Sequence, residues 1–323
     1  MKNMKCQYPD CQEDWNEQNP SCLCGEPDYK NCENYIGGTA EVGSATVQGT
    51  TSEEEKTIAW SGSAMGSIDL EFISAKRQPF VIGVIGQSKT GKTTLLATLY
   101  MLLRGGKMIG KYQFAGSYTL LGWEKLAHFL TFNSHKKISF PPHTSANMAR
   151  VPGLLHILLK DQNGIYKDLI FTDAPGEWFT EWAKSADSHA SIGAKWIDET
   201  AGAFILIADC GAFKASLGKE RHSLMQIIER MKNTHQNRPV ALAWTKSDYD
   251  FEEDIKVLMS NKVKNQLPGI STYNIAVVNR KSDDNLNDIL KLVENLLLEG
   301  EVHRNLIKPI AVKNEDDLFF TIR

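Results

Sequence analysis

The stretch GQSKTGKTTLL at residues 86–96 combines two glycines with two lysines at a spacing suited to binding phosphate. Gly86 and Gly91 allow backbone N–H groups to converge on phosphate oxygens, and a helix that begins at such a loop adds its partial positive charge. Lys92 is placed to reach the β- and γ-phosphates of a nucleotide, and the Thr93 hydroxyl to ligate Mg²⁺. The expected contact residues are Gly86, Gln87, Ser88, Lys89, Thr90, Gly91, Lys92, Thr93 and Thr94. The motif therefore predicts a site for a nucleoside triphosphate and its magnesium ion.

A second motif, Asp173-Ala-Pro-Gly176, directly follows an apolar segment later in the chain. An aspartate at a strand end can hold Mg²⁺ through water, and Gly176 can turn its N–H toward the γ-phosphate and so sense its presence. Asp-x-Pro-Gly is also ordinary turn chemistry, so the motif gains its meaning from its place after that strand. We expect Asp173 and Gly176 to face the phosphate loop.

A third motif, TKSD, spans Thr245 to Asp248 at the end of another apolar segment. The Asp248 carboxylate can accept two hydrogen bonds from N1–H and N2–H₂ of guanine, whereas adenine would leave the buried carboxylate unpaired. The aliphatic stem of Lys246 would lie over the base. The alternative interpretation is a helix N-cap at Ser247 or Asp248. With the other two motifs in order, Thr245, Lys246 and Asp248 predict a guanine-specific site.

The segments around these motifs alternate between strand and helix character. The expected strands lie at residues 79–86, 153–160, 166–173, 202–209, 239–246 and 273–278. The expected helices lie at residues 92–103, 117–132, 179–199, 219–234, 251–266 and 284–298. Near-continuous apolar runs such as residues 79–86 are typical of buried parallel strands. The Asn163-Gly164 pair is a hairpin signal that places one antiparallel strand at the edge of a mostly parallel α/β sheet.

The three motifs in this order resemble those of the translation-factor and Ras-like class of P-loop GTPases, which implies a Ras-like P-loop GTPase fold. Thr245 replaces the commoner asparagine of the N-K-x-D pattern, as in dynamin-like GTPases, so GTP is not excluded. The cysteine-rich N-terminus, AWSGSAMGS at residues 59–67 and VIGVIGQSKTGKTTLLATLYMLL at residues 81–103 are similar to the bacterial double-GTPase family of conflict (anti-phage) systems. Members of such systems act as paired GTPases that control an effector. The resemblance therefore implies a GTP-gated switch with a protein partner or a second GTPase subunit.

The resemblance also suggests roles for residues outside the motifs. Lys89 occupies the fourth position of the phosphate loop, where guanylate-binding and atlastin-like GTPases carry an arginine finger that acts on dimerising; a solvated loop lysine is the alternative. Glu177 takes the place of the water-orienting glutamine of Ras-like enzymes, and an exposed glutamate starting a helix explains it equally well. Thr144, in PPHTSANMAR, is the expected Mg²⁺-binding threonine of the first switch, in preference to Thr119 and Thr131 in an expected helix. The resemblance thus adds Lys89, Glu177 and Thr144 to Lys92 as catalytic candidates, and a nucleotide-dependent homodimer as one form of partnership.

Two further stretches have less defined roles. The loop that contacts guanine O6 should follow the strand at residues 273–278, near Val278-Asn279-Arg280, where the usual Ser-Ala is missing. EWFTEW places Trp178, Phe179 and Trp182 directly after the γ-phosphate sensor. Core packing explains aromatics at helical spacing, and a nucleotide-dependent partner surface is the alternative.

Composition limits the remaining classes of function. The chain has 323 residues of which 42% are hydrophobic, enough for a sizeable core, and its net charge of −3 gives no global attraction to nucleic acid or acidic membranes. No apolar run approaches the roughly 18–20 residues that cross a bilayer, and the N-terminus lacks the apolar core of a signal peptide. We therefore expect a cytoplasmic protein without a membrane span or specific nucleic-acid binding.

Most of the cysteines are concentrated near the N-terminus. These five are Cys6, Cys11, Cys22, Cys24 and Cys32. In a reducing cytosol such a cluster favours a metal site over disulfides, and four thiolates close a tetrahedral zinc site, which leaves one surplus. The spacing C-x4-C-x10-C-x-C-x7-C is not the usual paired C-x-x-C pattern, and a flexible cysteine-rich tail is the alternative. The low hydrophobicity of residues 1–35 favours zinc, because this segment could not fold by burial alone.

We therefore expect four parts along the chain. They are a zinc-binding segment at 1–35, a connector at 36–77, a GTPase domain at 78–300 and a C-terminal tail at 301–323 with a short strand at DDLFFTI. The leading function is a switch that binds and hydrolyses GTP and gates a partner or effector protein, in bacterial defence by the resemblance. Two alternatives stay open: a GTP-bound scaffold that does not hydrolyse, and a P-loop ATPase in which TKSD is coincidental.

Overall fold

The computed structural model describes residues 64–74, 77–130, 153–249, 251–277 and 284–306. The five N-terminal cysteines, Thr131, Thr144, Val278–Arg280 and the expected strand at residues 316–322 lie outside this part of the chain.

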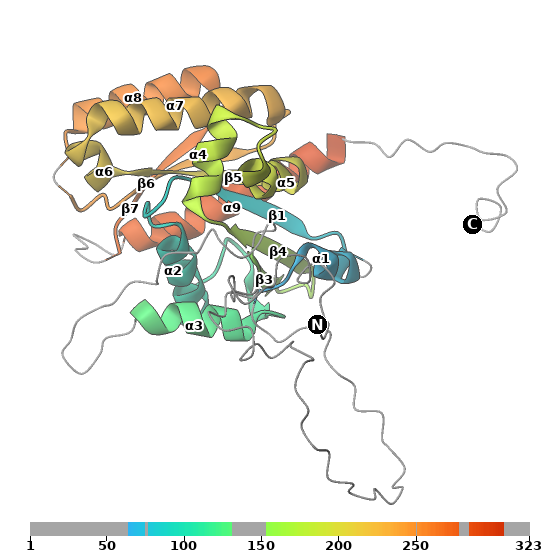
Figure 1. Cartoon of the computed structure of the whole chain (residues 1–323). Helices are drawn as coiled ribbons and strands as arrows, with labels where there is room; N and C mark the ends of the chain where they lie inside the picture. Colours follow the sequence, from blue (N-terminus) through green and yellow to red (C-terminus); the bar gives the residue numbers. More distant parts are fainter. Residues whose placement is uncertain (1–63, 75–76, 131–152, 250, 278–283, 307–323) are drawn as a thin grey trace, which may run out of the picture. The chain divides into compact units, whose positions relative to one another are not determined.

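A seven-stranded sheet forms the centre of the described fold (Figure 1). The strands are β1 (Phe80–Ile85), β2 (Gln113–Gly116), β3 (Gly153–Lys160), β4 (Tyr166–Asp173), β5 (Ala203–Asp209), β6 (Val240–Thr245) and β7 (Ser271–Ile275). Their order is β2-β3-β4-β1-β5-β6-β7, and only β3 runs against the others. The expected mostly parallel α/β sheet with one antiparallel strand is confirmed. That strand lies one place in from the edge, because β2 pairs with its outer side.

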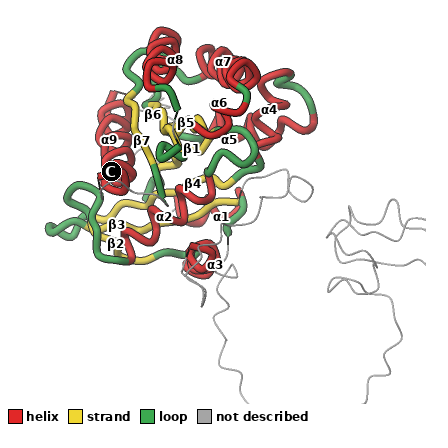
Figure 2. The backbone as a smooth tube through the Cα atoms, turned by 90° about the vertical axis from the view of Figure 1, so that its left-hand side faces the viewer, coloured by secondary structure: helices red, strands yellow, loops and turns green. Residues whose placement is uncertain are grey.

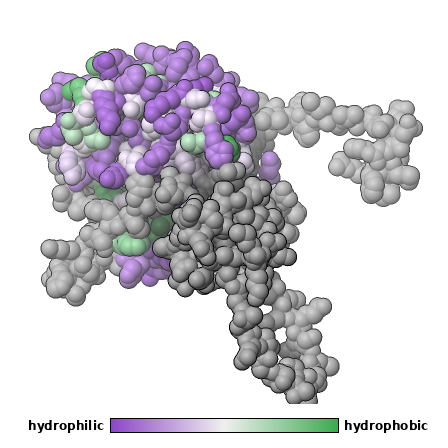
Figure 3. All heavy atoms as spheres, viewed as in Figure 1, coloured by the Kyte–Doolittle hydropathy of each residue, from purple (hydrophilic) through white to green (hydrophobic). Residues whose placement is uncertain are grey.

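Helices cover both faces of the sheet (Figure 2). They are α1 (Ser67–Ser74), α2 (Lys92–Arg104), α3 (Leu120–Leu130), α4 (Gly176–Lys184), α5 (Ile192–Thr200), α6 (Cys210–Ala215), α7 (Leu217–Thr234), α8 (Glu253–Gln266) and α9 (Asp284–Leu306), with a short 3₁₀ turn at His189–Ser191. One hydrophobic cluster joins α2, α3 and α9 to the sheet, and a second joins α1 and α4–α8 to the opposite face. The outer surface over α7 and α8 is mostly hydrophilic (Figure 3).

Strand β1 is an unbroken apolar run because both of its faces are buried. All six of its residues are buried; Ile82 and Val84 belong to one cluster, and Val81 and Ile85 to the other. A strand buried on both faces cannot alternate apolar with polar residues. This central position fixes the carboxyl end of β1, and with it the loop that starts at Gly86.

The helical prediction at residues 179–199 was wrong in one respect, because the chain folds there as α4, the 3₁₀ turn and α5. The Ser191 hydroxyl donates to the Ser185 carbonyl at 2.7 Å and lies 2.8 Å from the Ser188 hydroxyl. Serines favour such local hydrogen bonds over continuation of a helix. Within the expected connector at residues 36–77, Ser67–Ser74 form a helix, α1, which we did not predict from the sequence.

A buried polar network ties β3 to β4 on the α1 side of the sheet. The His156 ring accepts a hydrogen bond at Nδ1 from the Tyr118 N–H (3.0 Å), and its Nε2 lies 2.9 Å from Asp168 Oδ1. Arg77 Nε donates to the other Asp168 oxygen at 2.7 Å. Burial alone would raise the pKa of the Asp168 carboxyl, but the hydrogen bonds from His156 and Arg77 lower it overall. Thr119 belongs to the same network, because its hydroxyl accepts from the His156 N–H at 2.9 Å.

Candidate nucleotide-binding site

The loop Gly86–Gly91 connects the buried strand β1 to α2. Gly91 has φ +91°, a left-handed conformation that favours glycine, and its carbonyl accepts the first helical hydrogen bond, from Leu95 N at 2.8 Å. The Thr90 hydroxyl closes the turn by donating to the Gln87 carbonyl at 2.8 Å. The loop therefore ends at the N-terminus of a 13-residue helix, where backbone N–H groups and the helix dipole favour an anion.

Lys92 is buried beneath this loop, with 6% of its surface exposed. Its ammonium group donates to the Gly86 carbonyl at 3.1 Å and the Gln87 carbonyl at 2.7 Å. Burial lowers the pKa of Lys92 to about 8, and the nearby charges of Asp173 and Glu177 oppose this shift. The group is therefore held in place by neutral acceptors, and a phosphate would stabilise its charged form.

The second motif meets the loop at the start of α2. The Thr93 hydroxyl donates to Asp173 Oδ1 at 3.0 Å, which joins two oxygen groups of the kind that Mg²⁺ prefers. Gly176, the first residue of α4, packs so closely that an added Cβ would lie 2.1 Å from Ser88 N. No other residue fits there without displacing backbone. These residues thus fit a magnesium-bound phosphate chain in chemistry.

The third motif is bonded directly to the phosphate loop. The Thr245 hydroxyl donates to the Thr90 carbonyl at 2.7 Å, and Lys246 Nζ donates to the Lys89 carbonyl at 3.2 Å. Lys246 and Lys89 both have positive φ, +52° and +62°, so these contacts hold two strained residues against each other. Asp248 follows, partly buried, after the end of β6. The structure thus brings together the TKSD motif and the loop Gly86–Gly91, which lie far apart in the sequence.

Two acidic residues that we did not predict lie behind the loop. Asp209, the last residue of β5, accepts from Lys246 Nζ at 2.5 Å and caps α6 by accepting from Gly211 N at 2.8 Å. Glu220, in the first turn of α7, accepts from Gln87 Nε2 at 3.0 Å. Asp209 could have been suspected from its place at the end of an apolar strand. Glu220 has no sequence signal of its own.

The remaining expected residues fall in different places. Glu177 is partly buried in the first turn of α4, near Lys92. Lys89 is exposed at the tip of the loop. The interpretation of Trp178, Phe179 and Trp182 as a partner surface was wrong: all three lie in the core, at 6%, 0% and 2% exposure. Their helix turns its apolar side to the sheet, which is the ordinary reason for aromatics at this spacing.

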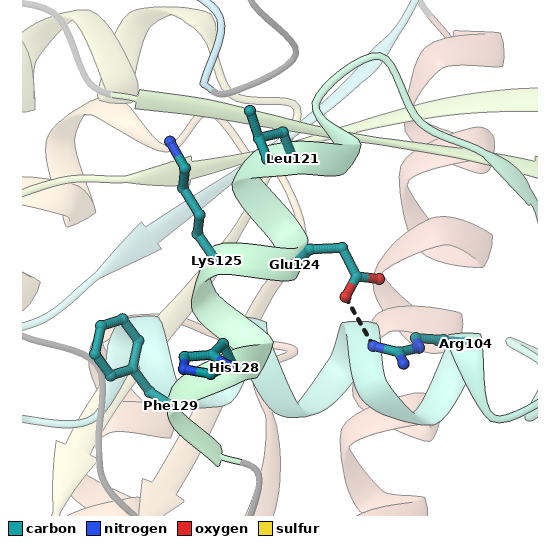
Figure 4. Close-up of a pocket in the computed structure, with 6 residues that line it drawn as sticks. All are labelled: Arg104, Leu121, Glu124, Lys125, His128 and Phe129. Carbon is teal, nitrogen blue, oxygen red and sulfur yellow. Dashed lines mark hydrogen bonds and ion pairs between the residues drawn. The ribbon is translucent and has the colours of Figure 1, made fainter.

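A separate hollow of about 640 Å³ lies on α3, away from these motifs (Figure 4). Arg104 of α2 and Glu124 of α3 form an ion pair at 2.8 Å at its border. Leu121, His128 and Phe129 line it from α3. No phosphate-loop residue contributes to it, so it is not part of the candidate nucleotide site.

The described residues contain no group of three or more His, Cys, Asp or Glu side chains arranged to hold a metal ion. Within the same ranges, every helix is too short or too polar to span a bilayer.

The sheet order and the loop after β1 define a P-loop GTPase fold of the Ras-like type. A family model described as DO-GTPase2, Double-GTPase 2, matches residues 80–299. Because this match covers more than half of the chain, the protein belongs to the Double-GTPase 2 family, which supports a GTPase-type function. No curated protein matches the chain.

Proposed function

We propose that this protein is a switch that binds and hydrolyses GTP and whose nucleotide state gates a partner or effector protein. The observation that carries the proposal is the contact between the TKSD motif and the phosphate loop, through Thr245–Thr90 and Lys246–Lys89. Because the same motif carries Asp248, whose carboxylate is suited to guanine, this contact supports a single site for base and phosphates.

In this proposal the chain's own groups divide the work of binding. Backbone N–H groups of residues 86–94 surround the phosphates, and Lys92 neutralises their charge. Thr93 and Asp173 would hold Mg²⁺, which when bound stabilises negative charge developing on the phosphate oxygens. Gly176 offers its N–H to the γ-phosphate, so that α4 follows the nucleotide state.

Other groups would act on base selection and on turnover. Asp248 accepts the two guanine hydrogen bonds while the stem of Lys246 covers the base. Glu177 orients the attacking water, Lys89 stabilises charge in the transition state, and Thr144 completes the magnesium shell from the first switch. We extend the proposal to a cytoplasmic location, a zinc site formed by four of the five N-terminal cysteines, and a role in bacterial defence alongside a second GTPase subunit.

Exchanging the guanine-reading carboxylate tests the proposal most directly. Asp248→Asn should weaken GTP binding by at least about tenfold and improve xanthosine triphosphate binding, because the amide pairs with the xanthine edge. Equilibrium titration with fluorescent nucleotides measures both. Unchanged GTP affinity would refute guanine specificity, and stronger binding of ATP than of GTP in the unmodified protein would favour the ATPase alternative. A protein that binds GTP tightly but releases no phosphate, alone or at high concentration, would be the scaffold.

A further inference from the structure

The surface beyond the carboxyl ends of β5 and β6 carries two groups of opposite charge side by side. The basic corner consists of Lys214, Lys219, Arg221 and His222, all exposed, where α6 meets α7. The acidic corner consists of Glu252, Glu253 and Asp254, all exposed, before and at the start of α8. In Figure 1 α6 and the starts of α7 and α8 lie together on the left of the molecule.

Contacts in the described structure show that the two corners adjoin. Phe213 of α6 meets Phe251 with ring centroids 6.0 Å apart, and both pack on Trp244. Gly211 would bring an added Cβ to 3.5 Å from the Tyr249 ring. Tyr249 is 54% exposed and therefore offers a large aromatic surface at the boundary between the corners.

Adjacent patches of opposite charge are self-complementary. In a two-fold symmetric pair, each patch meets its opposite on the other copy when the axis passes between the patches. Here such an axis would pass near Tyr249, and aromatic residues at the centre of an interface are its usual anchors. The exposed Leu217, beside the basic corner at 38% exposure, adds apolar area. We propose that the basic and acidic corners form the interface of a homodimer, and that a second copy of this chain is their partner.

The same surface is connected to the phosphate loop by the two acids behind it. Glu220 is the one acidic residue among residues 214–222, and it points inward to Gln87 of the loop. Asp209 caps α6 and holds Lys246, which contacts the Lys89 carbonyl. A partner that binds α6 and the start of α7 would therefore affect the phosphate loop through the contacts of Glu220 and Asp209. This coupling to turnover rests on the proposed GTPase function, whereas the interface itself does not.

Charge reversal tests the interface. Sedimentation without nucleotide, with GDP and with a non-hydrolysable GTP analogue should show a dimer in at least one of these states. The affinity of dimerisation should fall at least about tenfold when the salt concentration rises from about 50 to about 500 mM. Lys219→Glu with Arg221→Glu should weaken it at least about a hundredfold, as should Glu252→Lys with Asp254→Lys. An equimolar mixture of the two reversed proteins should restore association to within about tenfold of the original, because opposite charges then face each other at both contacts.

The matched control reverses two exposed lysines at the far ends of the same helices. Lys232→Glu with Lys264→Glu makes the same change in net charge as reversal of the basic corner and should leave self-association unchanged. A monomer in all three nucleotide states up to about 100 µM would overturn the proposal, as would a dimer that neither reversal weakens. Binding of RNA or DNA that is lost with the basic corner, without any self-association, would assign the corner to nucleic acid instead.

The coupling has its own test. Glu220→Ala should form the dimer as before but lose the rise of specific GTPase activity with protein concentration that the unmodified protein shows. If the rise persists, the path through Glu220 is wrong. If no GTP is bound at all, sedimentation without nucleotide still decides the interface, so failure of the GTPase proposal and failure of the dimer proposal give different results.

Discussion

Two buried charged groups, Lys92 at the start of α2 and Asp168 in β4, are satisfied in different ways. Lys92 donates to two backbone carbonyls, which carry no charge, and its pKa is lowered by burial to about 8. Asp168 accepts from His156 and Arg77 in an ion-paired network with both oxygens occupied. The first group is held by neutral acceptors, whereas the second is compensated by charge.

We expect this difference to separate a ligand-binding group from a structural one. A buried charge with neutral partners gains most when an oppositely charged ligand binds, so its electrostatic interaction contributes mainly to ligand affinity. A buried charge with a charged partner has already formed its ion pair, so that interaction contributes mainly to the free energy of unfolding. His–Asp pairs occur in catalytic sites too, but here the second ring nitrogen of His156 is occupied by the Tyr118 N–H and cannot take a proton from a substrate.

The largest expected effect is on nucleotide affinity at the first group. Lys92→Ala should weaken GTP binding by about a thousandfold, because it removes charge-assisted hydrogen bonds of about 1.5–3 kcal/mol each to phosphate. Thermal unfolding of the free protein should be unchanged or shifted upward, since a buried charge is removed. Nucleotide titration and differential scanning calorimetry measure the two quantities. A GTP affinity within about threefold of that of the unmodified protein would show that Lys92 is not a ligand-binding group.

The second group should respond in the opposite way. Asp168→Ala leaves the buried His156 without its acceptor and should cost about 1–3 kcal/mol of unfolding free energy in urea titration. GTP affinity of the folded protein should stay within about threefold. Lys184→Ala is the control, because it breaks the exposed Lys184–Glu181 pair and should cost less than about 1 kcal/mol. A loss of affinity as large as that of Lys92→Ala would show that the network serves the site.

Lys89 allows an exposed and a buried lysine of the same loop region to be compared, because Lys89 is exposed whereas Lys92 is buried. Lys89→Ala should leave GTP affinity nearly intact and reduce turnover at least about tenfold if its charge acts only in the transition state. Single-turnover phosphate release measures the chemical step. Equal turnover would make Lys89 a solvated lysine without a catalytic role.

The smallest expected effect is on pH dependence. Phosphate should raise the pKa of Lys92 above its free value of about 8, so that binding takes up a proton once the free group has begun to lose it. Below pH 8 Lys92 is already charged, and above pH 8 affinity should fall, by roughly fivefold to tenfold between pH 7.5 and 9. The Lys89→Ala protein should keep this slope. A flat profile over the same range would contradict the assignment to Lys92.

The central fold could be predicted from the sequence because its strands are buried on both faces and therefore appear as apolar runs. β2 was missed for the opposite reason: its four residues are alternately exposed and half-buried and leave no such run. The break between α4 and α5 depends on serine hydroxyls bonding across six residues, which periodicity does not report.

The three motifs of the site could be recognised because each is a short local pattern at a strand end. The contacts between them could not be predicted, since Thr245 and Thr90 are 155 residues apart and are brought together only by the order of the strands in the sheet. Glu220 illustrates the limit. It is one more charged residue in a polar helix until α7 is packed beside Gln87.

The close packing of Gly176 against the phosphate loop also links this loop to the intrinsic fluorescence of a tryptophan. Gly176 begins the helix that carries Trp178, a buried indole packed on Gly193 so closely that an added Cβ there would lie 2.1 Å from the ring. Any movement of Gly176 away from Ser88 carries this indole with it and changes what surrounds the ring. If the proposed switch moves Gly176, tryptophan emission should therefore change with the bound nucleotide and could be followed without an attached dye.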